Sequence, residues 1–137
     1  MRPQRFEALV LDLAKNDPRV GTVTTLKEAG DDRYPYGLAV RVDGREMRFQ
    51  FIAQSRDGDK FTEPERVTEA EQPFDVDRVP AGGLPEERFI AELVARSGSR
   101  ELVDVVIWSS RPDNRDGNEG ASFFFADTAR IYARVVR

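Results

Sequence analysis

Apolar and polar residues alternate most regularly between Gly37 and Ala53. Asp43 and Gly44 interrupt the alternation in its middle, and such a pair favours a two-residue hairpin turn because Gly accepts a positive φ. A turn at these residues sorts the apolar side chains onto one face: Leu38, Val40, Met47, Phe49 and Phe51. The opposite face takes Ala39, Arg41, Glu46, Arg48 and Gln50. The pattern therefore predicts a hairpin with one buried face, one solvated face and Arg41 opposite Glu46.

Two segments carry apolar residues with the period of an amphipathic helix. The first segment ends at Asn16-Asp17-Pro18, and its apolar residues are Phe6, Leu9, Val10 and Leu13. The second segment starts at Pro85 and ends at Gly98, with Phe89, Ile90, Leu93 and Val94 as its apolar residues. Pro in the first turn and Gly after the last turn are typical of helix ends. Residues 20–29, which are rich in β-branched side chains, predict a strand between the first helix and the hairpin.

The last third of the chain predicts two more strands, at residues 101–110 and 121–126, joined by a long turn. For residues 127–137 we predict a helix, because four apolar residues fall on one side of it: Ile131, Tyr132, Val135 and Val136. A strand is the alternative, because Ile131, Ala133 and Val135 also alternate with polar neighbours.

Phe124 is the residue on which the functional interpretation depends. A strand directs Phe123 and Phe125 to one face, which we expect to join the helix-covered core with Val103, Val105 and Ile107. Phe124 must then face the other way, and we expect it there with three residues: Trp108, Val106 and Leu102. An exposed apolar patch usually has a cover. The cover is either a second copy of the chain or Ile131 and Val135 of the same chain.

These elements predict a single α+β domain over residues 1–137, with a mostly antiparallel sheet and helices packed on one face. The predicted order is α-β-β-β-(long loop)-α-β-β-(α or β). Residues 55–83 form a long acidic excursion within the domain, because they contain many Pro, Gly and acidic residues and few apolar ones. Long segments of this kind are functional or mobile, and we expect this one to be the most mobile part of the chain.

Composition limits the chemistry. The chain has no Cys and no His, so the commonest general base, thiolate nucleophiles and the usual metal ligands are missing. The net charge is −4, and residues 57–92 hold 11 acidic and 4 basic residues, which disfavours nucleic acid as a partner. We expect neither a cofactor nor a metal. No apolar run reaches the ~20 residues of a membrane span, so we expect a cytoplasmic protein that does not enter the membrane.

The predicted order of elements resembles that of the small acidic dimeric chaperones that hold secretion substrates, and its first part resembles the core of the PD-(D/E)xK nucleases. The nuclease resemblance implies a metal held by an acid near the end of the second strand and by an acid-x-Lys on the third. Asp43 and the segment Glu46–Arg48 are the only candidates in place, and Arg48 cannot act as a base because it stays protonated. Two acidic turns, residues 57–59 and 113–120, could offer oxygens to Ca²⁺ but lack the EF-hand spacing.

The sequence favours a non-enzymatic protein-binding or adaptor module that forms a homodimer. Its partner-binding residues are Phe124, Trp108, Val106 and Leu102. The alternative is a carboxylate-dependent, Mg²⁺-assisted hydrolase or nuclease. The two classes differ in where the acids lie, since an enzyme of this kind gathers three or more acids in a pocket, whereas a binding module disperses them and exposes apolar side chains.

Overall fold

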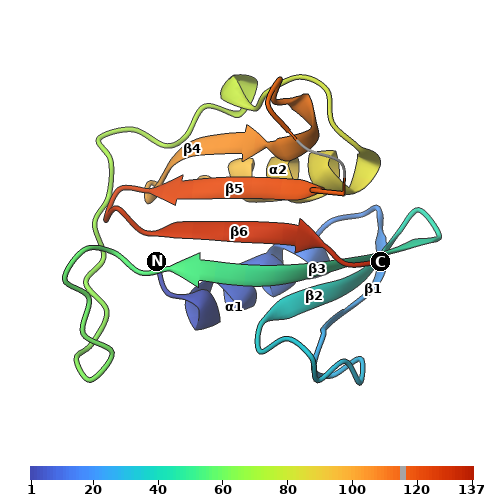
Figure 1. Ribbon diagram of the computed structural model, residues 1–137, viewed down its shortest axis with the longest axis horizontal. Coiled ribbons are helices and arrows are strands. Elements are labelled where there is room, and N and C mark those ends of the chain that lie inside the picture. Colours follow the sequence, from blue (N-terminus) through green and yellow to red (C-terminus); the bar gives the residue numbers. More distant parts are fainter. Residues whose placement is uncertain (115–116) are drawn as a thin grey trace.

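The protein is described by a computed structural model that covers residues 1–114 and 117–137. At its centre is an antiparallel sheet of six strands in the order β1-β2-β3-β6-β5-β4 (Figure 1). The strands are β1 Val20–Thr25, β2 Gly37–Val42, β3 Arg45–Gln54, β4 Leu102–Ile107, β5 Gly120–Phe125 and β6 Arg130–Val135. Two short 3-10 turns are present, η1 (Val76–Arg78) and η2 (Trp108–Ser110). The predicted α+β class is confirmed.

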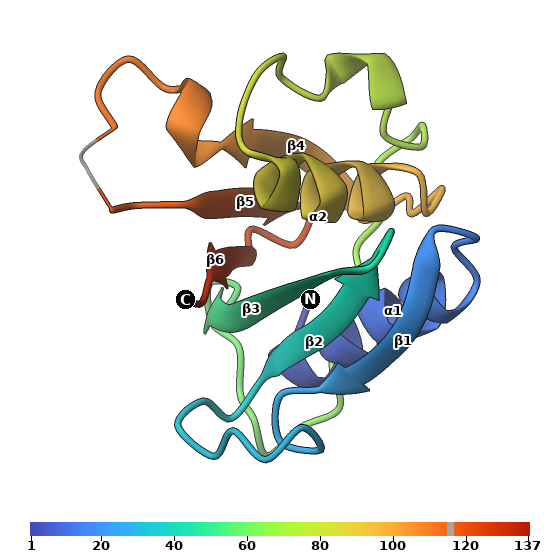
Figure 2. The same ribbon diagram turned by 90° about the vertical axis from the view of Figure 1, so that its right-hand side faces the viewer.

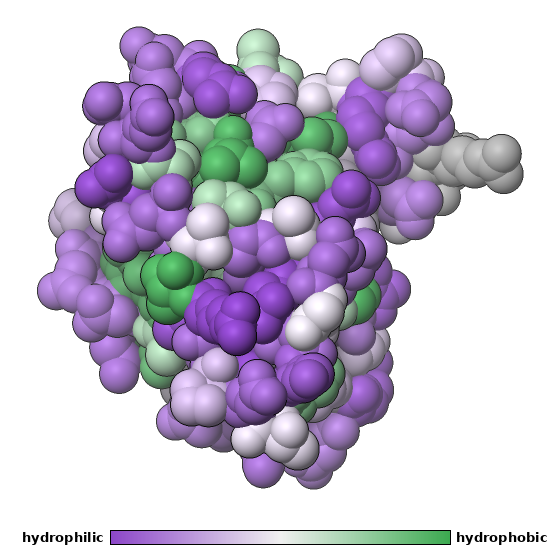
Figure 3. Space-filling view, turned by 90° about the vertical axis from the view of Figure 1, so that its left-hand side faces the viewer, coloured by the Kyte–Doolittle hydropathy of each residue, from purple (hydrophilic) through white to green (hydrophobic). Residues whose placement is uncertain are grey.

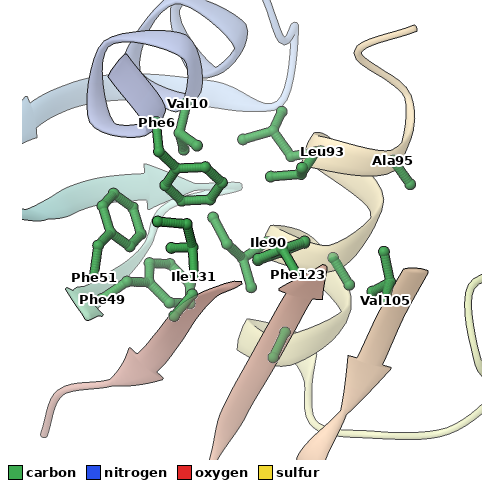
Figure 4. Packing of buried hydrophobic residues seen from close by; sticks show 14 of the residues in the cluster. Phe6, Val10, Phe49, Phe51, Ile90, Leu93, Ala95, Val105, Phe123 and Ile131 are labelled. Carbon is green, nitrogen blue, oxygen red and sulfur yellow. The ribbon is translucent and has the colours of Figure 1, made fainter. Parts of the chain in front are cut away.

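Both helices pack on the same face of the sheet, as predicted. α1 (Pro3–Lys15) lies against the β1–β3 half and α2 (Pro85–Ala95) against the β4–β6 half (Figures 1 and 2). The hydrophobic core lies between the two helices and this face of the sheet (Figure 4). The ring of Phe6 on α1 is 5.0 Å from that of Phe51 and 5.5 Å from that of Phe123, so one side chain joins the two halves of the sheet. Among the described residues, no helix combines the length and apolarity needed to cross a membrane.

The β2–β3 hairpin has the predicted register: Val42 pairs with Arg45, Arg41 with Glu46, Val40 with Met47 and Leu38 with Phe49. Asp43 and Gly44 have φ values of +49° and +81°, as a type I′ turn requires. Arg41 lies opposite Glu46 as predicted, but the two side chains bind other groups. Glu46 accepts a hydrogen bond from Nε of Arg48 at 2.8 Å, while Arg41 donates to the carbonyl of Gly44 at 2.6 Å.

Residues 130–135 form strand β6, and the predicted helix for this segment is wrong. β6 lies between β3 and β5 and pairs with both along its length (Figure 1). Without it, β3 and β5 would each leave a row of backbone N–H and C=O groups unpaired, which is costly inside a fold. Ile131, Ala133 and Val135 point into the core and are buried. The alternating pattern, not the helical one, describes this segment.

The expected face of Leu102 is also wrong. Leu102 pairs with Phe125, Asp104 pairs with Phe124, and the register shifts between them, which marks a β-bulge. A bulge changes the side to which the residues before it point. Leu102 is consequently in the core beside Phe125 and is only 1% exposed, whereas Val103, which we expected in the core, is half-buried. Asp104, beyond the bulge, lies on the outer side of the sheet opposite Phe124.

The acidic excursion, residues 55–83, has no strand and only the short turn η1. Several contacts hold it to the rest of the fold. Arg2 binds the carboxylate of Asp59 at 3.0 Å, and the backbone N–H of Ala70 donates to the carbonyl of Arg100 at 2.7 Å. Phe74 is buried in the core. The excursion is therefore attached at several points along its length, and its mobility stays a prediction.

Candidate interaction face

No helix of the described chain covers the second face of the sheet, which we call the outer face. The side chains that the strand pairing directs there are Thr22, Thr24, Ala39, Arg41, Glu46, Arg48, Gln50, Ile52, Gln54, Asp104, Val106, Ser122, Phe124, Arg130, Tyr132 and Arg134. Its β1–β3 half is polar, whereas its β4–β6 half mixes aromatic, apolar and charged side chains. The molecule viewed from the end where β5 finishes and β6 starts shows apolar patches between hydrophilic residues (Figure 3).

Phe124 lies on the outer face, as the alternation predicted, and is half-buried. Its cover within the chain is Arg130, the cross-strand neighbour on β6, whose guanidinium carbon is 5.1 Å from the ring centroid. A guanidinium over an aromatic face is a cation–π contact. Ile131 and Val135, the cover expected within the chain, point into the core instead. One arginine therefore shields Phe124 partly, and no apolar segment of the described chain lies over it.

Trp108 also belongs to the outer face, although it follows the end of β4. Its indole N–H donates to Oγ of Ser122 at 2.8 Å, and its ring lies on the backbone of Gly120. A Cβ at Gly120 would come 2.9 Å from the ring and 2.3 Å from the carbonyl oxygen of Ala133. Only Gly leaves room for the indole here, so the position of the Trp108 side chain depends on the absence of a Cβ at residue 120.

A buried carboxylate fixes this corner from the other side of the sheet. Glu87, in the first turn of α2, is 0% exposed and accepts three backbone hydrogen bonds. Their donors are the N–H groups of Leu84 at 2.8 Å, Gly120 at 2.9 Å and Ser109 at 3.1 Å. A carboxylate that satisfies three N–H groups compensates its own desolvation. Glu87 thereby ties α2 to the start of β5 and to η2, which carries Trp108.

A hollow of about 250 Å³ opens beside Trp108 on the outer face. Its lining consists of Trp108, Arg111, Asn118, Tyr132 and Arg134. Arg111 and Asn118 follow η2 in sequence, so both sides of the described chain around residues 115 and 116 contribute to this lining. Two guanidinium groups and two aromatic rings in one shallow hollow are typical of a surface that contacts another macromolecule.

The candidate acids of the alternative, hydrolase or nuclease interpretation lie apart from one another in the described part of the structure. Within the described part of the chain, no group of three or more acidic side chains is arranged to hold a metal ion. Asp43 is in the hairpin turn, and the carboxylate of Glu46 is bound by Arg48. In the first acidic turn, Asp59 is bound by Arg2, and this hydrogen bond lowers the pKa of Asp59 below its usual value. The second turn, residues 113–120, includes residues 115 and 116, which lie outside the described residues.

Of the four residues proposed to bind a partner, the structure brings three together. Phe124, Val106 and Trp108 share the outer face and are half-buried, while Leu102 is in the core. The sequence-based prediction missed Arg130, Tyr132 and Arg134 as neighbours of Phe124, because it placed residues 127–137 in a helix. The alternative prediction, a strand at residues 127–137, would have found them, because alternation in a strand directs these three residues to the face opposite Ile131.

Comparison with known proteins adds no relative: no family model matches the chain, and no curated protein or solved structure matches it either. The resemblances in element order therefore give no functional assignment, and we base the proposed function on the outer face.

Proposed function

We propose that the protein is a non-enzymatic protein-binding or adaptor module and that the outer face is its binding surface. The observation that carries this proposal is that a six-stranded sheet keeps one face free of described helices, with Phe124, Trp108 and Tyr132 on it. Aromatic residues and arginine are enriched in protein interfaces and supply most of their strongest contacts. The outer face combines both kinds of side chain.

The distribution of ion pairs supports the same surface. Twelve arginines lie within 4.0 Å of a carboxylate oxygen: Arg2, Arg5, Arg19, Arg33, Arg45, Arg48, Arg56, Arg78, Arg88, Arg96, Arg100 and Arg137. The other described arginines have no carboxylate of the described residues at that distance: Arg41, Arg66, Arg111, Arg130 and Arg134. Four of these five, all except Arg66, lie on the outer face or line its hollow. Guanidinium groups without a carboxylate partner among the described residues therefore concentrate there.

The alternative function, a carboxylate-dependent hydrolase or nuclease, has no comparable observation in its favour. Its candidate acids, Asp43 and Glu46, are separated into a turn and a surface ion pair. Residues 57–92 carry a net negative charge, so this segment would repel the phosphates of a nucleic acid. The proposed function is therefore protein binding in the cytoplasm, and the proposed partner is a second copy of the chain.

Site-specific photo-crosslinking tests the proposal. A crosslinking amino acid is placed at Tyr132 on the outer face and, as a control, at Arg66, which is exposed and belongs to the acidic excursion. In cells of the native host, we expect discrete protein adducts from position 132 and none from position 66. Equal labelling at both positions, or no protein adduct at position 132, would contradict the outer face as the binding surface.

A further inference from the structure

The half of the outer face around β5 has an ordered pattern of charge. Strand pairing places Asp104 of β4 opposite Phe124 of β5, and Phe124 opposite Arg130 of β6. An acid, an aromatic ring and a base thus lie in one row across three neighbouring strands. Since strands are about 4.8 Å apart, the acid and the base are roughly 10 Å from each other, too far for a direct ion pair.

The next row along the same three strands consists of uncharged side chains. Val106 pairs with Ser122, and Ser122 pairs with Tyr132. Beyond this row, the indole of Trp108 lies over Gly120, which pairs with Arg134 on β6. The apolar and aromatic groups of the face therefore follow the charged row directly.

Neither charged end of the first row has a close ion-pair partner within the described chain, and the guanidinium of Arg130 lies over the ring of Phe124. Arg130 has no carboxylate within 4.0 Å among the described residues. Asp104 has only the exposed guanidinium of Arg78 at 3.9 Å, a pair of small energetic value. An acid and a base on one face are thus both available to a partner that carries the opposite charges at the same spacing.

We infer that the partner of this surface is a second copy of the chain, bound face to face with the two-fold axis running along β5. This inference rests on the proposed function, because it identifies the protein that the outer face binds. A two-fold axis makes the contact self-complementary, so each side chain of β6 meets a side chain of β4 in the other copy. Arg130 then faces Asp104 of the second copy, twice in each dimer.

The apolar groups fit the same operation. Phe124 and Trp108 lie close to the axis. They meet their own copies when Arg130 turns from the Phe124 ring to Asp104 of the second copy, while Tyr132 faces Val106 of the second copy. Face-to-face sheets pack with their strands within about 30° of each other, which preserves these neighbours over the two or three rows concerned. The two Arg130–Asp104 pairs lie on either side of the aromatic residues at the axis. An apolar centre with a polar rim is common in stable interfaces.

The direction of the axis follows from charge. An axis at right angles to the strands, through the Ser122–Tyr132 row, would place Arg130 against Arg134 of the second copy. Two guanidinium groups in contact repel each other, and like charges across an interface suppress association. The axis along β5 instead brings unlike charges together at both ends. Of these two axes, charge complementarity favours the one along β5.

A charge-exchange experiment tests the geometry. Arg130→Asp sets two carboxylates against each other, at position 130 of one copy and at Asp104 of the other. Asp104→Arg sets two guanidinium groups against each other in the same places. By analytical ultracentrifugation of the purified full chain, we expect the wild type to be dimeric and each variant alone to associate at least about tenfold more weakly.

An equimolar mixture of the two variants should associate more tightly than either variant alone. In the heterodimer, one end pairs the two introduced side chains, which are of opposite charge, and the other end pairs the native Arg130 with the native Asp104. The control Arg66→Asp makes the same charge change in the acidic excursion and should leave the dimer unchanged.

Three results would overturn the inference: a wild type that stays monomeric at high micromolar concentration, variants that associate like the wild type, or a mixture no tighter than its components. Circular dichroism shows whether each variant is folded. Phe124→Asp gives a second test, because it removes the aromatic contact at the two-fold axis and places two carboxylates there. This variant should be a folded monomer.

The crosslink at position 132 separates this inference from the proposed function. An adduct with the mass of two chains supports the second copy as the partner. An adduct of another mass overturns the dimer and leaves protein binding in place.

Discussion

The carboxylate of Glu87 accepts a hydrogen bond from the backbone N–H of Gly120 at 2.9 Å, across 33 positions of sequence. This contact joins the first turn of α2 to the first residue of β5. Because Gly120 also supports the indole of Trp108, the buried acid on the helix side positions an aromatic ring on the outer face. The two faces of the sheet are thus coupled at one residue.

Glu87→Gln tests that coupling. The amide replaces one accepting oxygen by an NH₂ group, which then meets backbone N–H donors in a buried place. Hydrogen bonds to a charged group contribute about 1.5 to 3 kcal/mol each, so we expect the free energy of unfolding to fall by at least about 2 kcal/mol in urea titrations. Glu92→Gln on the same helix is the matched control. Its carboxylate pairs with Arg88 near the surface, and its loss should cost less than about 1 kcal/mol. Equal losses in the two variants would contradict the role of Glu87.

Gly120→Ala should displace the indole of Trp108. The added methyl group would lie 2.9 Å from the ring and 2.3 Å from the carbonyl oxygen of Ala133, and overpacking of this kind costs about 1 to 3 kcal/mol. Trp108 is the only tryptophan of the chain, so its fluorescence emission reports this site alone. We expect a red-shifted emission from a folded variant. An unchanged emission maximum would show that the ring does not rest on Gly120.

Gly44→Val should destabilise the hairpin. Gly44 has a φ of +81° and open space around its missing side chain, so the cost comes from the backbone conformation alone. L-residues lose roughly 1 to 2 kcal/mol in this region, and a β-branched residue loses more. Gly21→Ala is the control, because Gly21 lies in β1 with its nearest neighbouring atom 4.0 Å away. Urea titration of both variants gives the comparison, and a Gly44→Val variant as stable as the wild type would disprove the turn.

Acid should weaken the attachment of the excursion to α1. Hydrogen bonds from Arg5 hold the pKa of Glu65 below its usual value, although burial opposes this shift. A lowered pKa in the folded state means that Glu65 contributes its full stability above its unfolded pKa of about 4.3 and loses it as the pH falls below that value. The difference in unfolding free energy between the wild type and Glu65→Gln should therefore be larger at neutral pH than near a pH of about 3. A difference that does not change with pH would exclude this ion pair as a source of stability.

Limited proteolysis measures how firmly the middle of the excursion is held. The guanidinium of Arg100 donates to the carbonyls of Ala70 and Glu71 at 3.0 and 3.1 Å. Arg100→Ala removes these contacts, and we expect faster cleavage between residues 66 and 73 while the rest of the chain stays intact, because exposed, weakly held segments are cut first. The control Arg66→Ala removes an arginine that has no carboxylate within 4.0 Å in the described chain. Equal cleavage rates in wild type and Arg100→Ala would show that Arg100 does not hold the segment.

The sequence by itself determined the elements whose information is local. The β2–β3 register followed from Asp43-Gly44 and from the alternation on both sides of it, because a two-residue turn leaves one way of pairing the strands. The helices followed in the same way from the period of their apolar residues. The place of Phe124 on the outer face needed only the alternation of neighbouring residues in a strand.

The tertiary structure alone decided the rest, because those choices depend on residues far away in sequence. The pattern of residues 130–135 fits a helix or a strand almost equally well. The strand forms because its backbone can pair with the edges of both β3 and β5, and as a strand it places Arg130 and Tyr132 on the outer face. The bulge after Leu102 depends on pairing with β5, and it moves that leucine from the outer face into the core. Glu87 has the sequence context of a surface acid at a helix start, and it is buried because N–H groups from residues 109 and 120 converge on it.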